Sequence, residues 1–199
     1  MAYVEAAVRR GQLIRAARSV LARTGVAKTS LRAVATEAGV PLGTLQYVFP
    51  GKELLLRAVI EDVVDEIAEV LRALADAEHG LEHAIRTALT SFWTQLVDEQ
   101  HWGDQLMQYE LTVYSLRAAG QEELARWQYE RYANVIAEWC QLAANNAGET
   151  CRVPFGQLAR IILAGIDGLI LQHVCDPNQT RSRENLDALI DSFVSLTRA

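Results

Sequence analysis

The stretch "TSLRAVATEAGVPLGTLQYVFPGK", residues 29–52, decides the fold of the amino-terminal part of the chain. Ser30 offers a hydroxyl group that can cap a short helix, and Gly39 can take the left-handed turn that ends it. A second short helix starts beside Pro41 and stops at Pro50, where the next residue is a glycine. Two short helices joined by a tight turn predict a helix-turn-helix unit.

The second short helix divides into an inner and an outer face. Leu45 and Phe49 are spaced to pack against the first helix. The outward positions are Gly43, Thr44, Gln46 and Tyr47. A helix fits the major groove of DNA, where Gln can pair with adenine, Thr can meet a thymine methyl group, and a Tyr hydroxyl suits phosphate. Lys52, at the start of the next helix, could hold another phosphate.

Charge is distributed unevenly along the chain. Residues 1–57 hold nine Lys or Arg and three Asp or Glu. Residues 58–199 hold ten Lys or Arg and 22 Asp or Glu. A basic amino-terminal head on an acidic body suggests that the head meets a polyanion, although a chance clustering of solvated charges would give the same pattern.

The rest of the chain also predicts helices. A long helix from Lys52 to about Ala77 has one apolar face, and further patterns follow. These cover roughly 81–98, 104–118, 121–146, 155–174 and 183–198. We therefore expect an all-α fold with a three-helix helix-turn-helix head, residues 1–51, joined by the long helix to a helical body. This body comprises residues 52–199.

The segment "TSLRAVATEAGVPLGTLQYVFPGKELLLRAV", Thr29 to Val59, resembles the DNA-binding segment of the tetracycline-repressor (TetR) family of bacterial regulators. The resemblance implies an all-helical regulator with a variable body that binds a small molecule and dimerises. It also implies phosphate or base contacts by a set of head residues. These are Ser30, Arg32, Thr44, Tyr47 and Lys52.

Three positions depart from the family pattern. The family usually has a hydroxyl residue in place of Pro41, a Tyr in place of Gln46 and often a His in place of Val48. Pro41 cannot cap with its side chain, and Val48 cannot bond a phosphate. Gln46 either shifts the aromatic contact to Tyr47, which we favour, or reads a base.

Aromatic residues concentrate in the helices of 81–146, which contain all four tryptophans. Aromatic side chains with polar tips suit a mostly apolar ligand pocket, although such stripes are more often core. Glu110 is the expected inward carboxylate, with Arg131 or Gln128 as partner. Unpaired, it would favour a cationic ligand; paired with Arg131, it says nothing about ligand charge. The candidate ligand residues are Trp93, Met107, Glu110, Tyr114, Trp127 and Arg131.

Two apolar segments predict a homodimer, "FGQLARIILAGIDGLILQHV" from Phe155 to Val174 and "NLDALIDSFVSL" from Asn185 to Leu196. Two such helices from each subunit would form a four-helix bundle about a twofold axis. Burial within one chain is the alternative. The candidate interface residues are Ile162, Gly165, Gly168, Leu169, Leu189 and Phe193.

Other kinds of site find no support in the sequence. No catalytic constellation, phosphate loop or cofactor motif is present, so we expect neither an enzyme nor a bound cofactor. His79 and His83 are four residues apart, but Gly80 interrupts them, and we expect no metal site. Three scattered cysteines indicate no disulfide framework, and we expect a cytoplasmic protein without a membrane span or a signal peptide.

The sequence therefore predicts a ligand-responsive regulator, most readily a repressor, that binds a pseudopalindromic double-stranded DNA operator as a homodimer and is released by a small-molecule effector. Two alternatives stay open: a DNA-binding regulator without a small-molecule ligand, and a helical enzyme whose basic head binds an anionic cofactor. We also expect Lys52→Ala to weaken binding to all DNA sequences and to flatten its salt dependence.

Overall fold

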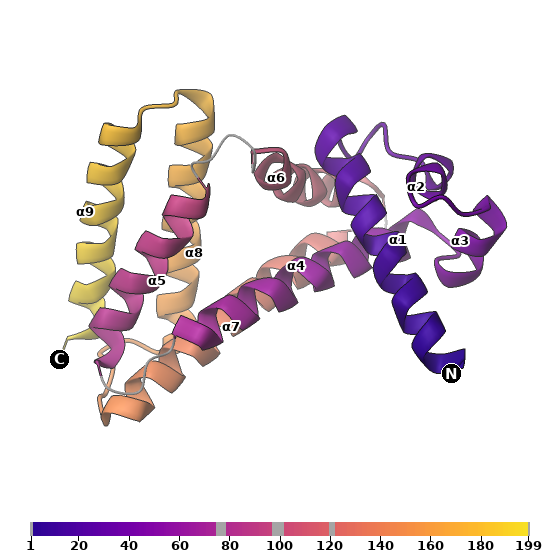
Figure 1. The fold of residues 1–199 in the computed structure, drawn as a ribbon. Helices are drawn as coiled ribbons and strands as arrows, with labels where there is room; N and C mark the ends of the chain where they lie inside the picture. The colour runs from indigo at the N-terminus through magenta and orange to yellow at the C-terminus, as the bar shows by residue number, and fades with distance from the viewer. Residues whose placement is uncertain (1, 75–78, 97–101, 120–121, 199) are drawn as a thin grey trace. The chain divides into compact units, whose positions relative to one another are not determined.

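The computed structural model describes residues 2–74, 79–96, 102–119 and 122–198, and all regular structure in these ranges is helical. Figure 1 shows the helices in chain order. They are α1 (Ala2–Thr24), α2 (Leu31–Glu37), α3 (Leu42–Val48), α4 (Lys52–Leu74), α5 (Gly80–Leu96), α6 (Trp102–Arg117), α7 (Glu122–Ala147), α8 (Phe155–Cys175) and α9 (Gln179–Thr197). The expected all-α fold is confirmed. The predicted end of the long helix near Ala77 lies outside the described residues.

The chain divides into two compact units. The first combines residues 1–63 with 103–128, and the second combines 64–102 with 129–199. Both α4 and α7 contribute residues to the two units, whereas almost all of α6 belongs to the first. The predicted domains, 1–51 and 52–199, stay a prediction; the compact units add that α6 packs in the same unit as the head.

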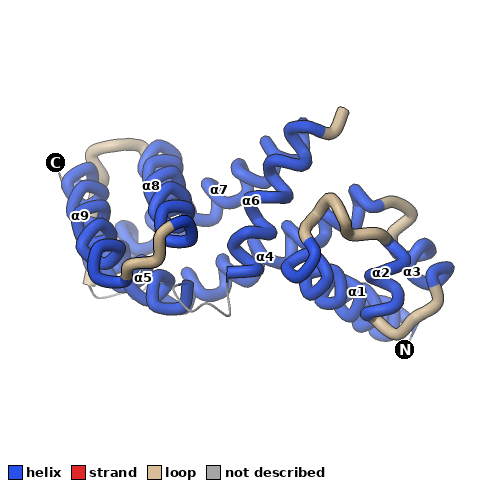
Figure 2. Tube along the Cα trace, turned by 90° about the horizontal axis from the view of Figure 1, so that it is seen from above, coloured by secondary structure: helices blue, strands red, loops and turns tan. Residues whose placement is uncertain are grey.

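The first three helices form the predicted helix-turn-helix head, in which α2 packs on both α1 and α3 (Figure 2). Ser30 accepts a hydrogen bond from the Ala33 N–H at 3.2 Å and so caps α2. Gly39 has φ +65°, and no atom would lie within 4 Å of a Cβ there. Backbone conformation, rather than lack of space, therefore favours glycine at this turn.

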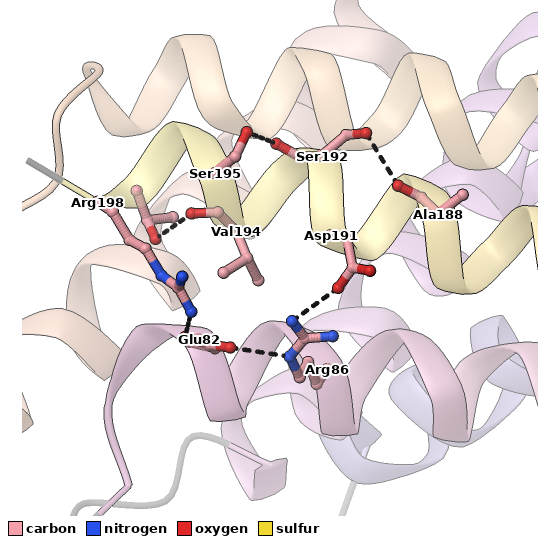
Figure 3. A network of polar contacts seen from close by, with 9 residues as sticks. Glu82, Arg86, Ala188, Asp191, Ser192, Val194, Ser195 and Arg198 are labelled. Atoms are coloured by element: carbon pink, nitrogen blue, oxygen red, sulfur yellow. Dashed lines mark hydrogen bonds and ion pairs between the residues drawn. The ribbon is translucent and has the colours of Figure 1, made fainter.

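In the second unit, α9 packs against both α8 and α5. The apolar contact is bordered by a charged network, in which Arg86 on α5 pairs with Glu82 and with Asp191 on α9 (Figure 3). Arg198 closes the network by pairing with the same Glu82. These residues are substantially exposed to water, so apolar burial contributes most of the stabilisation between α5 and α9.

Helix α8 is the most apolar helix of the second unit. By length and composition alone Phe155–Cys175 could cross a membrane, whereas the sequence led us to expect no membrane span. Core helices of soluble proteins meet the same test, so this is weak evidence. In the structure 39% of its 18-residue apolar window is buried within the chain, which leaves part of the apolar surface of α8 uncovered.

Candidate functional site

The outward face of α3 is the candidate DNA-reading surface. Tyr47 is 89% exposed, whereas Leu45 on the opposite face is fully buried and Phe49, just after the helix, is nearly so. Gly43 and Gln46 are exposed beside Tyr47. Thr44 is half-buried. The structure therefore places all four outward candidates of α3 on one accessible side.

Two further candidates lie at helix starts. Pro41 is exposed and takes the N-cap position of α3 without a side-chain hydrogen bond, as its chemistry requires. Ser30 is exposed as well, although its hydroxyl oxygen already accepts the Ala33 N–H. Arg32, in the first turn of α2, is exposed and has no ion-pair partner within the described residues.

Several other cations of the head are paired with carboxylates of the same unit. Arg10 pairs with Glu61 at 3.2 Å, and Arg23 pairs with Glu37 at 2.9 Å. The hydrogen bond from Arg23 is the largest cause of a lowered pKa of the Glu37 carboxyl group. Part of the positive charge counted in the sequence is therefore neutralised locally, which makes Arg32 more significant as a free cation.

Lys52 has a different environment from the one predicted. Its Nζ atom donates a hydrogen bond to the Val26 carbonyl oxygen at 2.6 Å and lies 5.1 Å from the centre of the Tyr114 ring. Burial lowers the pKa of the Lys52 ammonium group. Sequence reasoning placed this ammonium on a phosphate because nothing local to Lys52 indicates a backbone partner 26 residues earlier.

Three of the six candidate ligand residues contact residues of the head or of the adjoining α4. Glu110 is exposed, and its carboxylate accepts a hydrogen bond from the Val26 N–H at 2.8 Å, with neither Arg131 nor Gln128 among the partners seen. Tyr114 lies against Lys52, and the Arg57 guanidinium stands 4.5 Å from the centre of the Trp127 ring. Trp127 also lines an open groove of the first unit, and the part of all three residues in ligand binding stays a prediction.

The remaining candidate ligand residues are divided between the units. Met107, in the first unit, is almost fully buried. In the second unit, Trp93 is buried beside His173, with 5.5 Å between the ring centres. Arg131 reaches Asp65 at 3.6 Å, and its Nε atom is buried without a hydrogen-bond partner.

The second unit contains polar groups that sequence reasoning missed. His173 is 4% exposed, and its Nδ1 atom lies 2.9 Å from Ser182 Oγ. Tyr129 on α7 donates a hydrogen bond to Asp167 on α8 at 3.0 Å. Both Asp167 and His173 occur inside the apolar segment that we assigned to a dimer interface, and a polar residue inside such a segment was the available signal.

Several of the candidate dimer residues are covered within the single chain. Ile162, Leu169 and Phe193 are all buried in the single subunit. A Cβ atom added at Gly165 would lie 2.7 Å from Phe193 Cζ, so the close approach that Gly165 permits is between α8 and α9 of one chain. Burial within the chain is thus seen for these residues, and their part in a dimer interface stays a prediction.

The other two candidates, Gly168 and Leu189, are half-buried. A Cβ added at Gly168 would meet no atom within 4 Å.

A small open groove lies in the first unit, beside the start of α4. Its volume is about 390 Å³, and its lining combines carboxylates, leucines and an aromatic ring. The lining residues are Glu53, Leu54, Arg57, Ala119, Glu123, Leu124 and Trp127. Within the described residues no group of three or more His, Cys, Asp or Glu could hold a metal ion, and the His79 and His83 rings lie 4.7 Å apart.

Comparison with known proteins places these features in context. Residues 13–59 match the family described as "Bacterial regulatory proteins, tetR family". The chain is 27% identical to the HTH-type nicotine-responsive transcriptional repressor HdnoR of Paenarthrobacter nicotinovorans, over 94% of each chain. It is 29% identical to the HTH-type transcriptional regulator BetI of Stenotrophomonas maltophilia, over 83% of this chain and 81% of that one.

Solved structures show the same fold. The multidrug binding protein EbrR complexed with ethidium is 27% identical, covers 91% of this chain and 98% of its own, and superimposes with a TM-score of 0.62. A regulator from Rhodococcus sp. is 19% identical, with a TM-score of 0.76 and coverage of 96% and 98%. Because its sequence identity is low, the similarity to the Rhodococcus regulator supports the fold alone.

Proposed function

Because the chain belongs to the TetR family of bacterial regulatory proteins, we propose that it is a repressor that binds a pseudopalindromic operator as a homodimer and leaves it when a small-molecule effector binds. The observation that carries the proposal is the outer face of α3, where Tyr47 is exposed opposite the buried Leu45. Two such helices would enter successive major grooves about 34–36 Å apart.

Operator reading is assigned to the exposed side of the helix-turn-helix. In this proposal Thr44, Gln46 and Tyr47 face the major groove, and Gly43 lies on the same exposed side of α3. Ser30, Arg32 and Pro41 lie at the helix starts, where phosphates approach most closely.

The test is footprinting of DNA selected by the protein from random sequence, followed by titration of variants. We expect Tyr47→Ala to weaken operator binding at least about tenfold. The exposed Val70→Ala in α4 is the matched control and should bind as the parent does. Equal binding of all DNA sequences by the parent protein would refute the proposal.

The effector is proposed to be a nitrogen-containing aromatic compound that binds in the second unit. One similar protein is named as nicotine-responsive, and another is bound to ethidium. The buried Trp93 and the Tyr129–Asp167 hydrogen bond offer an aromatic surface and a carboxylate that suit such compounds.

Thermal unfolding with nicotine, ethidium and a neutral apolar compound tests the effector proposal. A rise in Tm with one of the nitrogen compounds, together with release from operator DNA, is the expected result. Asp167→Asn should reduce both effects. No shift with any compound across a diverse set would favour the alternative, a DNA-binding regulator without a small-molecule ligand.

The homodimer is proposed to form through the uncovered surfaces of α8 and α9. On α8, Ile161, Ala164, Gly168 and Leu171 recur on one side, and Leu171 is 42% exposed. Ala188 and Ser192 are exposed one turn apart on α9. Small and apolar residues at this spacing allow a close crossing with the same helices of a second copy.

Light scattering after size exclusion tests the dimer. Ala164→Glu should give monomers, because it places a carboxylate in the proposed interface without a partner. Asn146→Glu adds the same charge at an exposed site on α7 and should leave the dimer intact. A dimer that survives Ala164→Glu would refute this interface. A cytoplasmic location without membrane binding completes the proposal.

A further inference from the structure

Val26, in the turn between α1 and α2, has both of its backbone polar groups held by side chains that are distant in sequence. Its N–H donates to Glu110 Oε2 of α6 at 2.8 Å, and its carbonyl accepts from Lys52 Nζ of α4 at 2.6 Å. Its own side chain is buried. We call Glu110, Lys52 and the Val26 backbone the Val26 clamp. Both of its hydrogen bonds involve a charged group, which makes them stronger than neutral ones.

Gly25 permits the approach of the carboxylate. Its φ is +78°, and a Cβ atom at this position would lie 2.7 Å from Glu110 Oε2. The backbone conformation of this turn therefore favours glycine, and the Glu110 carboxylate lies directly against it.

One face of α6 supports the same region. Gly103, Met107, Glu110 and Tyr114 recur at intervals of four, three and four residues, which places them on one side of a helix. Gly103 packs beside the Ala22 carbonyl oxygen, which would lie 3.2 Å from a Cβ there. Tyr114 offers its ring to the Lys52 ammonium. α6 thus contacts the end of α1, the turn and the lysine that holds the turn.

The clamp continues into the start of α2. The Val26 carbonyl oxygen also accepts the Thr29 N–H at 3.3 Å, and Thr29 Oγ1 donates to the Gly25 carbonyl at 2.8 Å. Thr29 directly precedes Ser30, the N-cap of α2. Because α2 packs on α3, we expect a change in the turn to alter the position of α3.

We propose that Lys52 and Glu110 are positioning residues that set operator affinity through the Val26 backbone, and that the Lys52 ammonium does not act as a phosphate contact. The proposal rests on operator binding as proposed above. It reverses the expectation from sequence for Lys52, because the structure commits this ammonium to a carbonyl oxygen in a partly buried site. A phosphate contact would instead require the ammonium to release that oxygen.

The salt dependence of operator binding separates the two roles. Each phosphate contact contributes about 0.9 to the slope of log K against log salt concentration. Lys52→Met should weaken operator binding by about tenfold and leave this slope at the parent value, because it removes the hydrogen bond that the charged Lys52 donates to the Val26 carbonyl oxygen but removes no phosphate contact. Arg32→Met is the matched control, since it removes an unpaired cation of the same head and should reduce the slope.

Glu110→Gln tests the other half of the clamp and is mild enough to preserve the fold. It should weaken binding with an unchanged slope, and the double variant with Lys52→Met should lose less than the product of the single losses, because the two residues hold the adjacent peptide groups on either side of the Val26 Cα atom. A slope reduced by about 0.9 in Lys52→Met would overturn the proposal. Parent-like affinity in both single variants would also overturn it.

Amide hydrogen exchange keeps the clamp testable if the parent binds no operator. Both variants should exchange faster at Val26 and through the first turn of α2, while α8 stays as in the parent. Unchanged protection at Val26 would overturn the clamp independently of DNA binding.

Discussion

Gly25 and Gly165 mark close approaches in the two compact units, and they show how differently these units are packed. In the first unit, the Glu110 carboxylate occupies the space beside Gly25 and accepts a backbone N–H of the turn. In the second unit, the Phe193 ring of α9 occupies the space beside Gly165 of α8. The contact at Gly25 depends on the direction of a hydrogen bond and on the charge of the carboxylate, whereas the contact at Gly165 depends on side-chain volume.

This difference predicts that the two units respond differently to substitutions. Polar contacts such as the Val26 clamp depend on the exact chemical group, so replacement by a residue of similar shape is enough to break them. The α8–α9 contact tolerates a change of polar surroundings but responds to any change in side-chain volume. Substitutions in the two units should therefore differ in size and in how they can be rescued.

Phe193→Ala should have the largest effect. The ring is 2% exposed and fills the space above Gly165, so its removal leaves a cavity and should lower the free energy of unfolding by about 3–5 kcal/mol. Urea unfolding at fixed protein concentration measures the loss. Leu142→Ala, at an exposed leucine of α7, is the control and should cost far less. Equal losses would show that packing around Gly165 is not tight.

Gly165→Ala should destabilise by about 1–3 kcal/mol, because the added methyl group overlaps the Phe193 ring. Phe193→Leu in the same chain should restore part of the loss by making room. An increase in Tm for Gly165→Ala alone would contradict the close approach and would instead reflect the higher helix propensity of alanine.

Gly25→Ala should cost a similar amount but should not be rescued in the same way. Glu110→Ala removes the overlap with the new Cβ, yet the backbone stays at φ +78°, where a residue other than glycine costs about 1–2 kcal/mol. Full recovery of stability in the double variant would show that space, and not conformation, decides this position.

Substitutions at two helix caps, one in each unit, give a matched comparison with a smaller expected effect on stability. Ser30 accepts the Ala33 N–H at the start of α2, and Asn178 accepts the Arg181 N–H at the start of α9. Replacing either with Ala should lower stability by about 1 kcal/mol. Only Ser30→Ala should also weaken operator binding, and equal operator affinity in both variants would argue against a role of the α2 start in reading DNA.

Cys140 provides the smallest effect. Burial raises the pKa of its thiol from 9.0 to about 12. The folded state therefore keeps a proton that the unfolded state releases, so this contribution to stability is complete below pH 9.0 and declines as the pH rises toward about 12.

Between about pH 8 and about pH 9.5 the loss should be about 0.8 kcal/mol, measured as the difference between the parent and Cys140→Ala. The exposed Cys175 should react readily with a thiol reagent at neutral pH while Cys140 stays protected. Rapid labelling of Cys140 in the folded protein would contradict its burial.

Local sequence signals predicted the helix-turn-helix head well. The Ser30 cap, the positive φ of Gly39 and the burial of Leu45 all depend on residues within a few positions of one another, and all three are present in the structure. The outward side of α3 follows from the same helical spacing. The residues that bind DNA remain predictions within that surface.

The sequence contained no signal that identifies which residues an individual side chain contacts. Helical spacing predicts that Ile162, Leu169 and Phe193 are buried, but it does not indicate whether a second chain or the same chain covers them. Similarly, Glu110 and Lys52 are charged residues on helices, and nothing nearby in sequence connects them with Val26, 84 and 26 residues away.

The sequence by itself determined an all-helical chain with a helix-turn-helix head and an exposed face on α3, because helix caps, turns and apolar periodicity act over short distances. Only the tertiary structure decided that α6 packs with the head, that Gly165 faces Phe193, and that the Lys52 ammonium meets the Val26 carbonyl. These contacts depend on which helix faces meet after the chain has folded, and a periodic pattern does not specify that choice.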